Sequence, residues 1–411
     1  MNWKHVSLGE ISVNIQTGPF GSQLHQSDYS EKGTPVVMPK DLISGHISEE
    51  SIARVSDDHV ERLSRHKIEV GDILYSRRGD VGRCAFASET EAGWLCGTGC
   101  LRVTIDSRKA NPKFVFYQLL KADTIGWVEK HAVGSTMLNL NTSILSSVPI
   151  DLPSHDKQNH IVGVLSAYDD LIENNQKQIK LLEEAAQRLY KEWFVDLRFP
   201  GHETTPIVDG VPEGWTYKPF SEAFDYVRGK SYTSKELSDT TGILMANLKN
   251  IRAFGGYNRN AEKRFTGQYK ANQMLYAGDI VMGVTDMTQE RRLVGHVALV
   301  PDLGEKMTFS MDLIKIIPQL TDNLFLYSAM YYGGLSKQIS PLANGVNVLH
   351  LKPEAMMGIE MLIPTKDILE RYHQQFAPMV TRIEALQKQC DVAAEARDRL
   401  IPKLMNREIE V

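Results

Sequence analysis

The chain has 411 residues, enough for two or three domains with cores of their own. Its 42% hydrophobic and 24% charged residues are ordinary for a globular protein, and a net charge of −5 excludes a chain that is basic throughout, as many nucleic-acid binders are. Because no apolar run approaches the thickness of a bilayer and the N-terminus lacks an apolar signal segment, we expect a cytoplasmic protein with no membrane contact.

Residues 1–155 are predicted to form one domain of short strands separated by turns, called domain 1 below. The alternation of apolar residues predicts strands at 72–75, 84–87 and 101–105. A helix is expected at 112–120, where Pro112 suits the first helical turn. These elements together indicate a mixed α+β domain.

A long amphipathic helix is predicted next, at residues 156–194 within a central region of residues 156–200. Its apolar residues recur in alternating steps of three and four, which is the spacing of a coiled-coil seam, with Asn175 as the polar exception. Such a seam predicts burial against a second helix. The glycines and prolines after Phe199 then predict an irregular linker.

Residues 201–365 repeat the first domain and are called domain 2. The stretch 277-AGDIVMGVTDMTQERRLVGHVALV-300 resembles 70-VGDILYSRRGDVGRCAFA-87, with six extra residues in the loop. The domain ends also align, 345-GVNVLHLKPEAMMGIEMLIP-364 with 134-GSTMLNLNTSILSSVPIDLP-153, at an offset of 211 residues. We expect a second mixed α+β domain, with strands at 280–283, 296–300 and 313–317 and a helix at 323–332.

The C-terminal region, residues 366–411, carries the matching long helix. Adding 211 to the seam positions of the first helix gives apolar residues again, except that Arg397 stands where the first helix has Ala186. Two such seams in one chain most simply pack on each other as an intramolecular pair. We expect the core of this pair to contain Ile161, Leu165, Ile172, Ile179, Leu182, Leu189, Phe376, Met379, Ile383, Leu386, Leu400 and Leu404.

No catalytic or metal-binding constellation emerges from the sequence. The tripeptide 229-GKS-231 lacks the preceding glycine of a phosphate-binding loop, since Phe224 stands there, and the carboxylates of 301-PDLGEK-306 are too close together for a nuclease-type cation site. The cysteines at 84, 96, 100 and 390 form no CxxC pair, which favours reduced thiols over a zinc site. We therefore predict no catalytic residue and no metal in this chain.

The loops that follow the two Gly-Asp-Ile strands are the strongest candidates for DNA contact. Arginine, glutamine, aspartate and threonine side chains can all bond base edges, although an ordinary solvated loop is the alternative. The loop candidates are Arg77, Arg78 and Arg83 in domain 1 and Thr285, Asp286, Gln289, Arg291 and Arg292 in domain 2. Further candidates are Lys40, Lys249, Asn250 and, from the glycine-rich stretch 17–24, Ser22 and Gln23.

Over essentially its whole length, the chain resembles the specificity subunits of type I restriction-modification systems. The resemblance is carried by 152-LPSHDKQNHIVGVLSAYDDLIENNQKQIKLLEEAAQRLYKEWF-194, with its proline turn, glutamine and long helix ending in an aromatic residue. Further markers are 71-GDIL-74, 81-VGRCAFA-87, 97-GTGCLR-102, 278-GDIV-281 and 285-TDMT-288. One departure is Leu369, which occupies the place of Gln158 in the second helix.

This resemblance implies two target-recognition domains held apart by an antiparallel pair of long helices. Each domain would read one half of a bipartite, asymmetric site in double-stranded DNA. The helices would dock two methyltransferase subunits, restriction (translocase) subunits would join them, and these partners would use S-adenosylmethionine, ATP and magnesium. A helix of about 37 residues spans roughly 55 Å, about one and a half turns of DNA, so we expect it to set the spacer length.

Three other interpretations stay open at the level of sequence. A chain with its own methyltransferase or nuclease activity would modify DNA in isolation. A coiled-coil interaction protein without a DNA role would form homodimers and show no salt-dependent affinity for DNA. A specificity subunit could also serve a methylation-only or other phage-defence complex, which would differ only in its partners.

Overall fold

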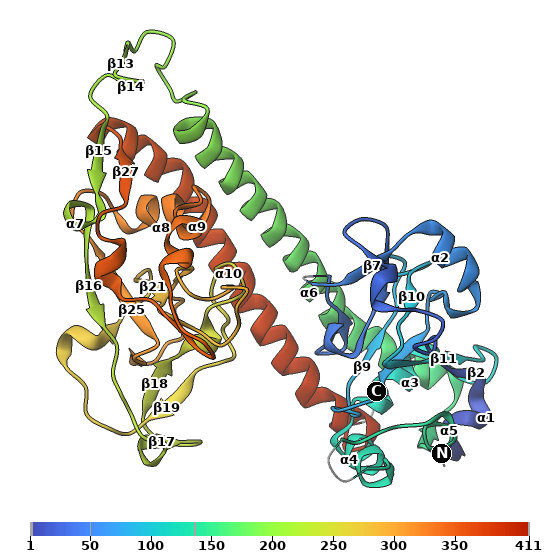
Figure 1. The fold of residues 1–411 in the computed structure, drawn as a ribbon. Coiled ribbons are helices and arrows are strands. Elements are labelled where there is room, and N and C mark those ends of the chain that lie inside the picture. Colours follow the sequence, from blue (N-terminus) through green and yellow to red (C-terminus); the bar gives the residue numbers. More distant parts are fainter. Residues whose placement is uncertain (1–2, 50, 135–136, 410–411) are drawn as a thin grey trace. The chain divides into compact units, whose positions relative to one another are not determined.

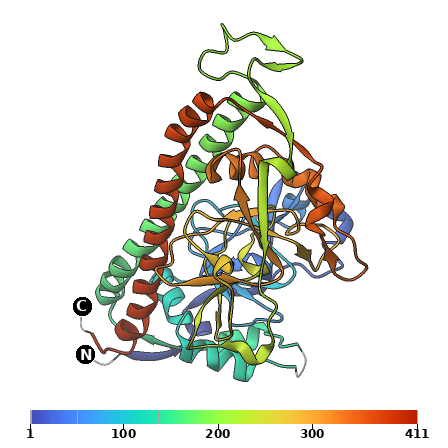
Figure 2. The same ribbon diagram turned by 90° about the vertical axis from the view of Figure 1, so that its left-hand side faces the viewer.

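The computed structural model describes residues 3–49, 51–134 and 137–409, and the chain divides into two compact units. Unit 1 comprises residues 1–174 and 390–411, and unit 2 comprises residues 175–389. Two long helices contribute residues to both units, so each unit combines one globular domain with part of each helix. Figure 1 draws these helices as unbroken green and red ribbons, and Figure 2 shows them from a second direction.

Two four-stranded sheets form the globular part of unit 1 (Figure 1). The first is antiparallel and has the strand order β2 (Ser12–Thr17), β11 (Cys100–Ile105), β8 (Ile73–Ser76) and β9 (Cys84–Phe86). The second has the order β10 (Leu95–Cys96), β4 (Thr34–Val37), β7 (Ala53–Val55) and β3 (Tyr29–Ser30), in which β10 and β4 are parallel. Short pairs join β1 (Lys4–Ser7) to β12 (Pro149–Leu152) and β5 (Leu42–Ile43) to β6 (His46–Ile47). The short helices are α1 (Leu8–Ile11), α2 (Asp57–Arg62), α3 (Pro112–Leu119), α4 (Ala122–His131) and α5 (Thr142–Ser146).

Unit 2 follows the same plan with a five-stranded second sheet. Its antiparallel sheet has the order β16 (Phe224–Arg228), β25 (Leu313–Pro318), β21 (Ile280–Gly283) and β23 (Val297–Leu299). The second sheet has the order β17 (Leu237–Ser238), β19 (Lys263–Phe265), β18 (Ile243–Ala246), β24 (Met307–Phe309) and β20 (Met274–Leu275). Short pairs are β13 (Ile207–Val208) with β14 (Val211–Pro212), β15 (Thr216–Pro219) with β27 (Glu360–Ile363), and β22 (Thr285–Asp286) with β26 (Leu349–His350). Its short helices are α7 (Phe220–Ala223), α8 (Asn323–Tyr331) and α9 (Leu335–Ile339).

The predicted strands and short helices of both domains are confirmed to within one residue at either end. The Gly-Asp-Ile motif explains why β8 and β21 begin where they do. Gly71 and Gly278 have φ angles of +89° and +85°, which side chains with a Cβ rarely adopt. A carboxylate oxygen of the next residue, Asp72 or Asp279, accepts the amide three residues earlier at 2.8 or 2.9 Å. The motif therefore caps a turn and starts a strand.

The long helices are α6 (His155–Tyr190), which ends in a π-turn over Lys191–Val195, and α10 (Lys366–Met405). They run antiparallel where they meet within each unit, because residue numbers rise along α6 while they fall along α10. The contacts that show this are Asp169–Arg397 and Ile172–Cys390 in unit 1, and Asn175–Gln389 and Gln178–Arg382 in unit 2.

The apolar stripe of each long helix packs against the adjoining domain as well as against the other helix. Ile161 and Leu165 lie with Leu404 in the core of domain 1, and Phe376 lies in the core of domain 2. Ile172 and Leu386 are buried outside these clusters. The other predicted core positions are only partly buried: Ile179, Leu182, Leu189, Met379, Ile383 and Leu400. In a simple coiled coil the two helices bury their apolar stripes against each other alone. Here the globular domain of each unit buries part of these stripes as well.

Candidate nucleic-acid interface

Residues 77–83 of unit 1, called loop A, connect β8 to β9 and carry three arginines. A second segment of the same domain, residues 133–140 or segment A, holds the backbone of loop A. The contacts are a bridge between Arg78 and Asn139, a 3.0 Å bond from the Gly79 amide to the Leu138 carbonyl, and a 2.8 Å bond from the Leu140 amide to the Arg77 carbonyl. Backbone hydrogen bonds thus hold loop A to segment A.

The three arginines of loop A have different surroundings. Arg83 is exposed, and its Nε lies 2.6 Å from a carboxylate oxygen of Asp80. Arg78 is exposed, whereas Arg77 is half-buried, and the buried Nε of Arg77 has no hydrogen-bond partner among the described residues. A buried donor without an acceptor costs about 1–3 kcal/mol. Arg77 would therefore meet an external acceptor through its terminal Nη groups, since its Nε is buried.

Residues 285–294 of unit 2, called loop B, are held in the same way by residues 344–351, or segment B. The two short strands of loop B and segment B, β22 and β26, pair antiparallel. Each segment is also closed on itself by an equivalent bridge, Asn344–His350 in segment B and Val133–Asn139 in segment A. Each of these bridge residues in segment B lies 211 positions after its counterpart in segment A. Both units therefore present one loop on one supporting segment.

Asp286 is the internal support of loop B. Its carboxylate is fully buried and accepts four hydrogen bonds, from the Thr288 amide and hydroxyl at 2.9 Å and from the amides of Leu293 and Val294 at 2.7 and 3.3 Å. Burial alone would raise the pKa of this carboxyl, but the hydrogen bonds outweigh it and hold the pKa below its usual value. A carboxylate committed in this way shapes the loop and is not free to accept from a cytosine.

One residue of loop B, and one residue bonded to the loop, have strained backbone conformations. Arg291 has a φ of +52°, and Phe254, whose amide donates to the Arg292 carbonyl at 2.7 Å, has a φ of +65°. For residues with a Cβ this left-handed conformation costs roughly 1–2 kcal/mol each. The buried His296 hydrogen-bonds to the backbone of Arg291 and Phe254, which partly opposes the lowering of its pKa by burial. These contacts keep loop B in one conformation despite the strain.

The side chains of loop B divide into supporting and available groups. Thr285 is buried with Asp286, and Arg292 forms an ion pair with Glu290. Gln289 is exposed, and its Nε2 donates to the Val346 carbonyl of segment B at 2.9 Å. Arg291 is half-buried, and its buried Nε has no hydrogen-bond partner among the described residues, as in Arg77. Each unit therefore contains one loop arginine with an unsatisfied Nε.

The remaining candidates also separate by exposure. Lys249 and Ser22 are exposed, and Lys40 is exposed with its Nζ 2.7 Å from the Ser51 carbonyl. Gln23 accepts the Phe20 amide and closes a turn. Asn250 is fully buried, and its amide bonds Asn247, Asn258 and Glu262. The structure therefore places Asn250, Asp286 and Thr285 inside unit 2, where the side chains of Asn250 and Asp286 bond the surrounding loops.

Segments A and B were not among the residues singled out from the sequence. Their signal was present, because the repeat aligns 134-GSTMLNLN-141 with 345-GVNVLHLK-352, but no chemistry-bearing side chain drew attention to it. Two residues of that alignment, Ser135 and Thr136, lie outside the described residues. Only pairing in three dimensions shows that these segments support the arginine-bearing loops.

Neither loop contains a metal or nucleophile site. In the part of the chain that the structure describes, no three histidine, cysteine or acidic side chains are grouped to hold a metal ion. Burial raises the pKa of Cys84 and Cys96 to about 12, which keeps both thiols protonated and unreactive. No helix within the described ranges is both long and apolar enough to cross a bilayer. The loops can thus offer hydrogen bonds and positive charge.

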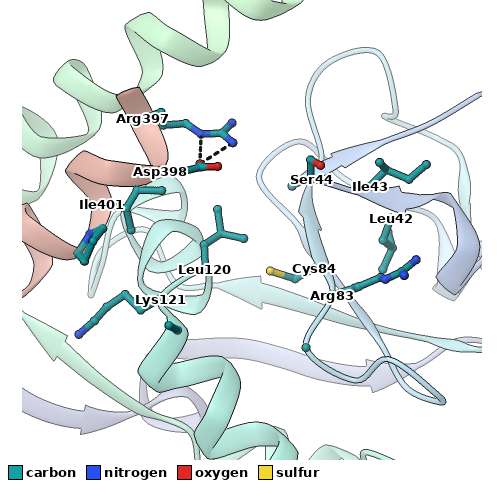
Figure 3. Close-up of a pocket in the computed structure, with 14 residues that line it drawn as sticks. Leu42, Ile43, Ser44, Arg83, Cys84, Leu120, Lys121, Arg397, Asp398 and Ile401 are labelled. Carbon is teal, nitrogen blue, oxygen red and sulfur yellow. Dashed lines mark hydrogen bonds and ion pairs between the residues drawn. The ribbon is translucent and has the colours of Figure 1, made fainter. Parts of the chain in front are cut away.

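Unit 1 also has a cleft with a cavity volume of about 690 Å³ (Figure 3). Leu120 and Ile401 lie on one side of it, and Ser44 lies on the other. At the offset of 211 residues, the positions of unit 2 that match Leu120 and Ile401 hold the aromatic residues Tyr331 and Tyr190. Tyr331 packs on Tyr332 with ring centroids 4.8 Å apart. The two units therefore differ in the residues beside the long helices as well as in their loops.

A family model described as the type I restriction modification DNA specificity domain matches residues 1–184. That range covers domain 1 with loop A and most of α6. The N-terminal part of the chain is thus similar to the DNA specificity domains that this model describes.

Full-length relatives extend this likeness to the whole chain. The MjaIX specificity subunit of Methanocaldococcus jannaschii is 27% identical over 92% of this chain and 87% of its own length. The HindI specificity subunit of Haemophilus influenzae is 22% identical over 99% of this chain and 100% of its own. The S subunit of a type I restriction-modification system from M. genitalium shares the fold, with a TM-score of 0.56 and 15% identity over 98% of this chain and 96% of that one. Over its whole length the chain is therefore similar to specificity subunits of type I restriction enzymes.

Proposed function

We propose that this chain is the non-catalytic DNA-recognition subunit of a type I restriction-modification complex. Domains 1 and 2 are its two target-recognition domains, and each reads one half of a bipartite, asymmetric site in double-stranded DNA. Loop A and loop B make the contacts, with Arg77 and Arg291 as the principal donors.

One observation carries this proposal. Both units contain the same construction, a loop fixed by a supporting segment and bearing an arginine whose buried Nε lacks an acceptor. Guanidinium groups bind phosphate oxygens and the O6 and N7 edge of guanine in a two-point manner. A rigid loop suits such readout because its side chains need little further ordering on binding. DNA is therefore the ligand that best fits both loops in a chain that is similar to type I specificity subunits.

The helices have a separate role in the proposal. As an antiparallel coiled coil, α6 and α10 hold the two recognition domains a fixed distance apart, and their outer faces dock two methyltransferase subunits. Restriction (translocase) subunits join this core. The partners perform the chemistry and bind S-adenosylmethionine, ATP and magnesium. With a net charge of −5 on this chain, they also supply much of the positive charge that grips the phosphates.

The test is genome-wide methylation mapping in cells that express this chain with and without the methyltransferase subunit encoded beside it. The proposal predicts one bipartite motif, with an adenine modified in each half, that appears only when both proteins are present. If an active methyltransferase with this chain produces no new motif, the chain does not direct recognition, and a coiled-coil interaction role replaces the proposal.

A further inference from the structure

The two loop pairs expose apolar side chains beside their polar ones. In unit 2, Met287 at the tip of loop B is 74% exposed, and Val346 in segment B is 89% exposed. In unit 1, Val133 and Met137 of segment A are 62% and 63% exposed. Single exposed apolar residues are common on protein surfaces, but each unit places a methionine and a valine on the same supported loop pair.

The apolar pair of unit 2 is held in place by its neighbours. Asp286, which precedes Met287, accepts four hydrogen bonds, and the amide of Gln289 bonds the carbonyl of Val346. The two apolar side chains therefore project from a backbone that is fixed on both sides of the tip. Because the backbone is fixed, the loop cannot easily turn these apolar side chains into the protein. They are instead placed to contact a surface of matching shape.

The neighbouring groups indicate the kind of surface. Gln289 and Arg291 stand within a few residues of Met287, and their side-chain types pair with adenine and guanine in the major groove. The apolar group that DNA exposes in the major groove is the 5-methyl group of thymine. Apolar protein side chains contact this methyl group. Charged and apolar contacts on one loop therefore match the edge of a mixed DNA sequence better than a uniformly apolar protein surface.

We infer that Met287 and Val346 form an apolar contact to a thymine 5-methyl group in the half-site of domain 2, and that Met137 and Val133 do the same for domain 1. This inference rests on the proposed function and names the base chemistry that the loops read. It adds an apolar readout to hydrogen-bonding residues that the sequence already suggested.

The test uses the assembled complex of this chain with its methyltransferase subunits and a duplex containing the mapped motif. Each thymine of the domain 2 half-site is replaced in turn by uracil, which removes only the 5-methyl group. At one position the replacement should weaken binding by the unaltered protein by roughly fourfold, the worth of one buried methyl-sized group. Met287→Ala should weaken binding of the thymine duplex to a similar extent and should respond less to uracil than the unaltered protein, because Val346 alone then faces the methyl group.

Two variants serve as controls. Met287→Leu keeps an apolar side chain and should restore the response to uracil. Ile207→Ala removes a side chain that is 60% exposed on the β13–β14 hairpin and should leave every affinity unchanged. Met137→Ala should reduce the effect of uracil in the half-site of domain 1 and leave its effect in the half-site of domain 2 unchanged.

The outcomes separate this inference from the proposed function. Uracil effects that are equal in the unaltered protein and in Met287→Ala would overturn the thymine contact while leaving DNA recognition intact. So would a Met287→Ala protein that assembles poorly with its partners but binds the motif normally once assembled, which would place the methionine in a protein interface. Absence of any sequence-specific binding would overturn the proposed function and this inference with it.

Discussion

Nη1 of Arg397 in α10 lies 2.8 Å from Oδ1 of Asp169 in α6, and both side chains are buried. The other carboxylate oxygen of Asp169 accepts the Tyr117 hydroxyl at 2.5 Å, and Arg397 also bonds Asp398. Burial would raise the pKa of Asp169, but the hydrogen bonds from Tyr117 and Arg397 hold it below its usual value. Helix packing in unit 1 therefore depends on a satisfied buried ion pair.

The internal repeat supplies a control for this pair. The positions in unit 2 that correspond to Asp169 and Arg397 are Val380 and Ala186, which pack in an apolar core. Arg397→Ala should destabilise unit 1 by about 3 kcal/mol, because the buried Asp169 carboxylate loses its nearest cation and keeps Lys113 at 3.5 Å and the Tyr117 hydroxyl. The double variant Asp169→Val with Arg397→Ala should lose less stability than Arg397→Ala alone, because no charge is then left buried. Hydrogen exchange of amides 161–170 measures both, and equal loss in the two variants would contradict the argument.

The same residues show what the sequence could and could not reveal. The seam pattern located both helices and marked Arg397 as the break in the second one. It gave no reason to connect Arg397 with Asp169, which lies 228 positions earlier and outside the apolar series. Periodicity along a helix reports which residues face inward, but the partner of a buried charge is set by packing between segments distant in sequence.

Gln158 and Leu369 give a second example. The sequence marked this exchange as a departure between the two helices, and the structure supplies its reason. Gln158 is buried, accepts the Asn111 amide at 2.8 Å and donates to the Pro153 carbonyl at 2.9 Å. At the start of α8 in unit 2, the N-cap residue Asp322 instead pairs with His373 at 2.9 Å, and Leu369 packs in the core. The two units therefore use different residues to bond the polar groups at the starts of α3 and α8. An alignment of the repeats alone cannot show this.

Asp286 should control the order of loop B. Asp286→Asn keeps one acceptor oxygen and turns the other into a donor that faces backbone amides, so we expect faster hydrogen exchange at Leu293 and Val294. Specific DNA affinity should fall by about tenfold or more, because a lost hydrogen bond to a charged group is worth about 1.5–3 kcal/mol. Glu290→Gln makes the same charge change at an exposed position of loop B. The explanation fails if Glu290→Gln weakens specific binding as much as Asp286→Asn.

Arg77 and Arg83 should contribute unequally although both lie in loop A. Arg77→Ala should cost about 1–3 kcal/mol on the specific site, because its guanidinium is available to a base edge. Arg83→Ala should cost less, since Asp80 already occupies its Nε. Titrations with the mapped site and with random DNA of equal length measure both variants. An equal loss of affinity on the two DNAs would make Arg77 a phosphate contact and remove it from base readout.

His66 should give unit 1 an acid-sensitive stability. Burial, together with the positive charges of Arg65 and Arg102, lowers the pKa of His66 to about 4. Between about pH 6.5 and pH 4 the imidazole of His66 is protonated in the unfolded chain but stays neutral in the folded unit. The free energy of unfolding should therefore fall as the pH falls from about 6.5 towards 4. His66→Gln should flatten this part of the curve. Chemical denaturation at a series of pH values measures the difference, and parallel curves for the two proteins would contradict it.

Helix length should set the spacing between the two half-sites. We expect one added heptad in each helix, between residues 174 and 175 and between residues 389 and 390, to keep the seam in phase, because seven residues return to nearly the same helix face. Seven residues add roughly 10 Å, which corresponds to about three base pairs of DNA. Methylation mapping should therefore find both half-sites unchanged and the spacer longer by about three base pairs. Seven glycine and serine residues inserted after Gly210, in the β13–β14 hairpin, provide the control and should leave the spacer as it was. An unaltered spacer in the heptad variant would show that the separation of the half-sites is fixed by something other than α6 and α10, with the partner subunits as the next place to look.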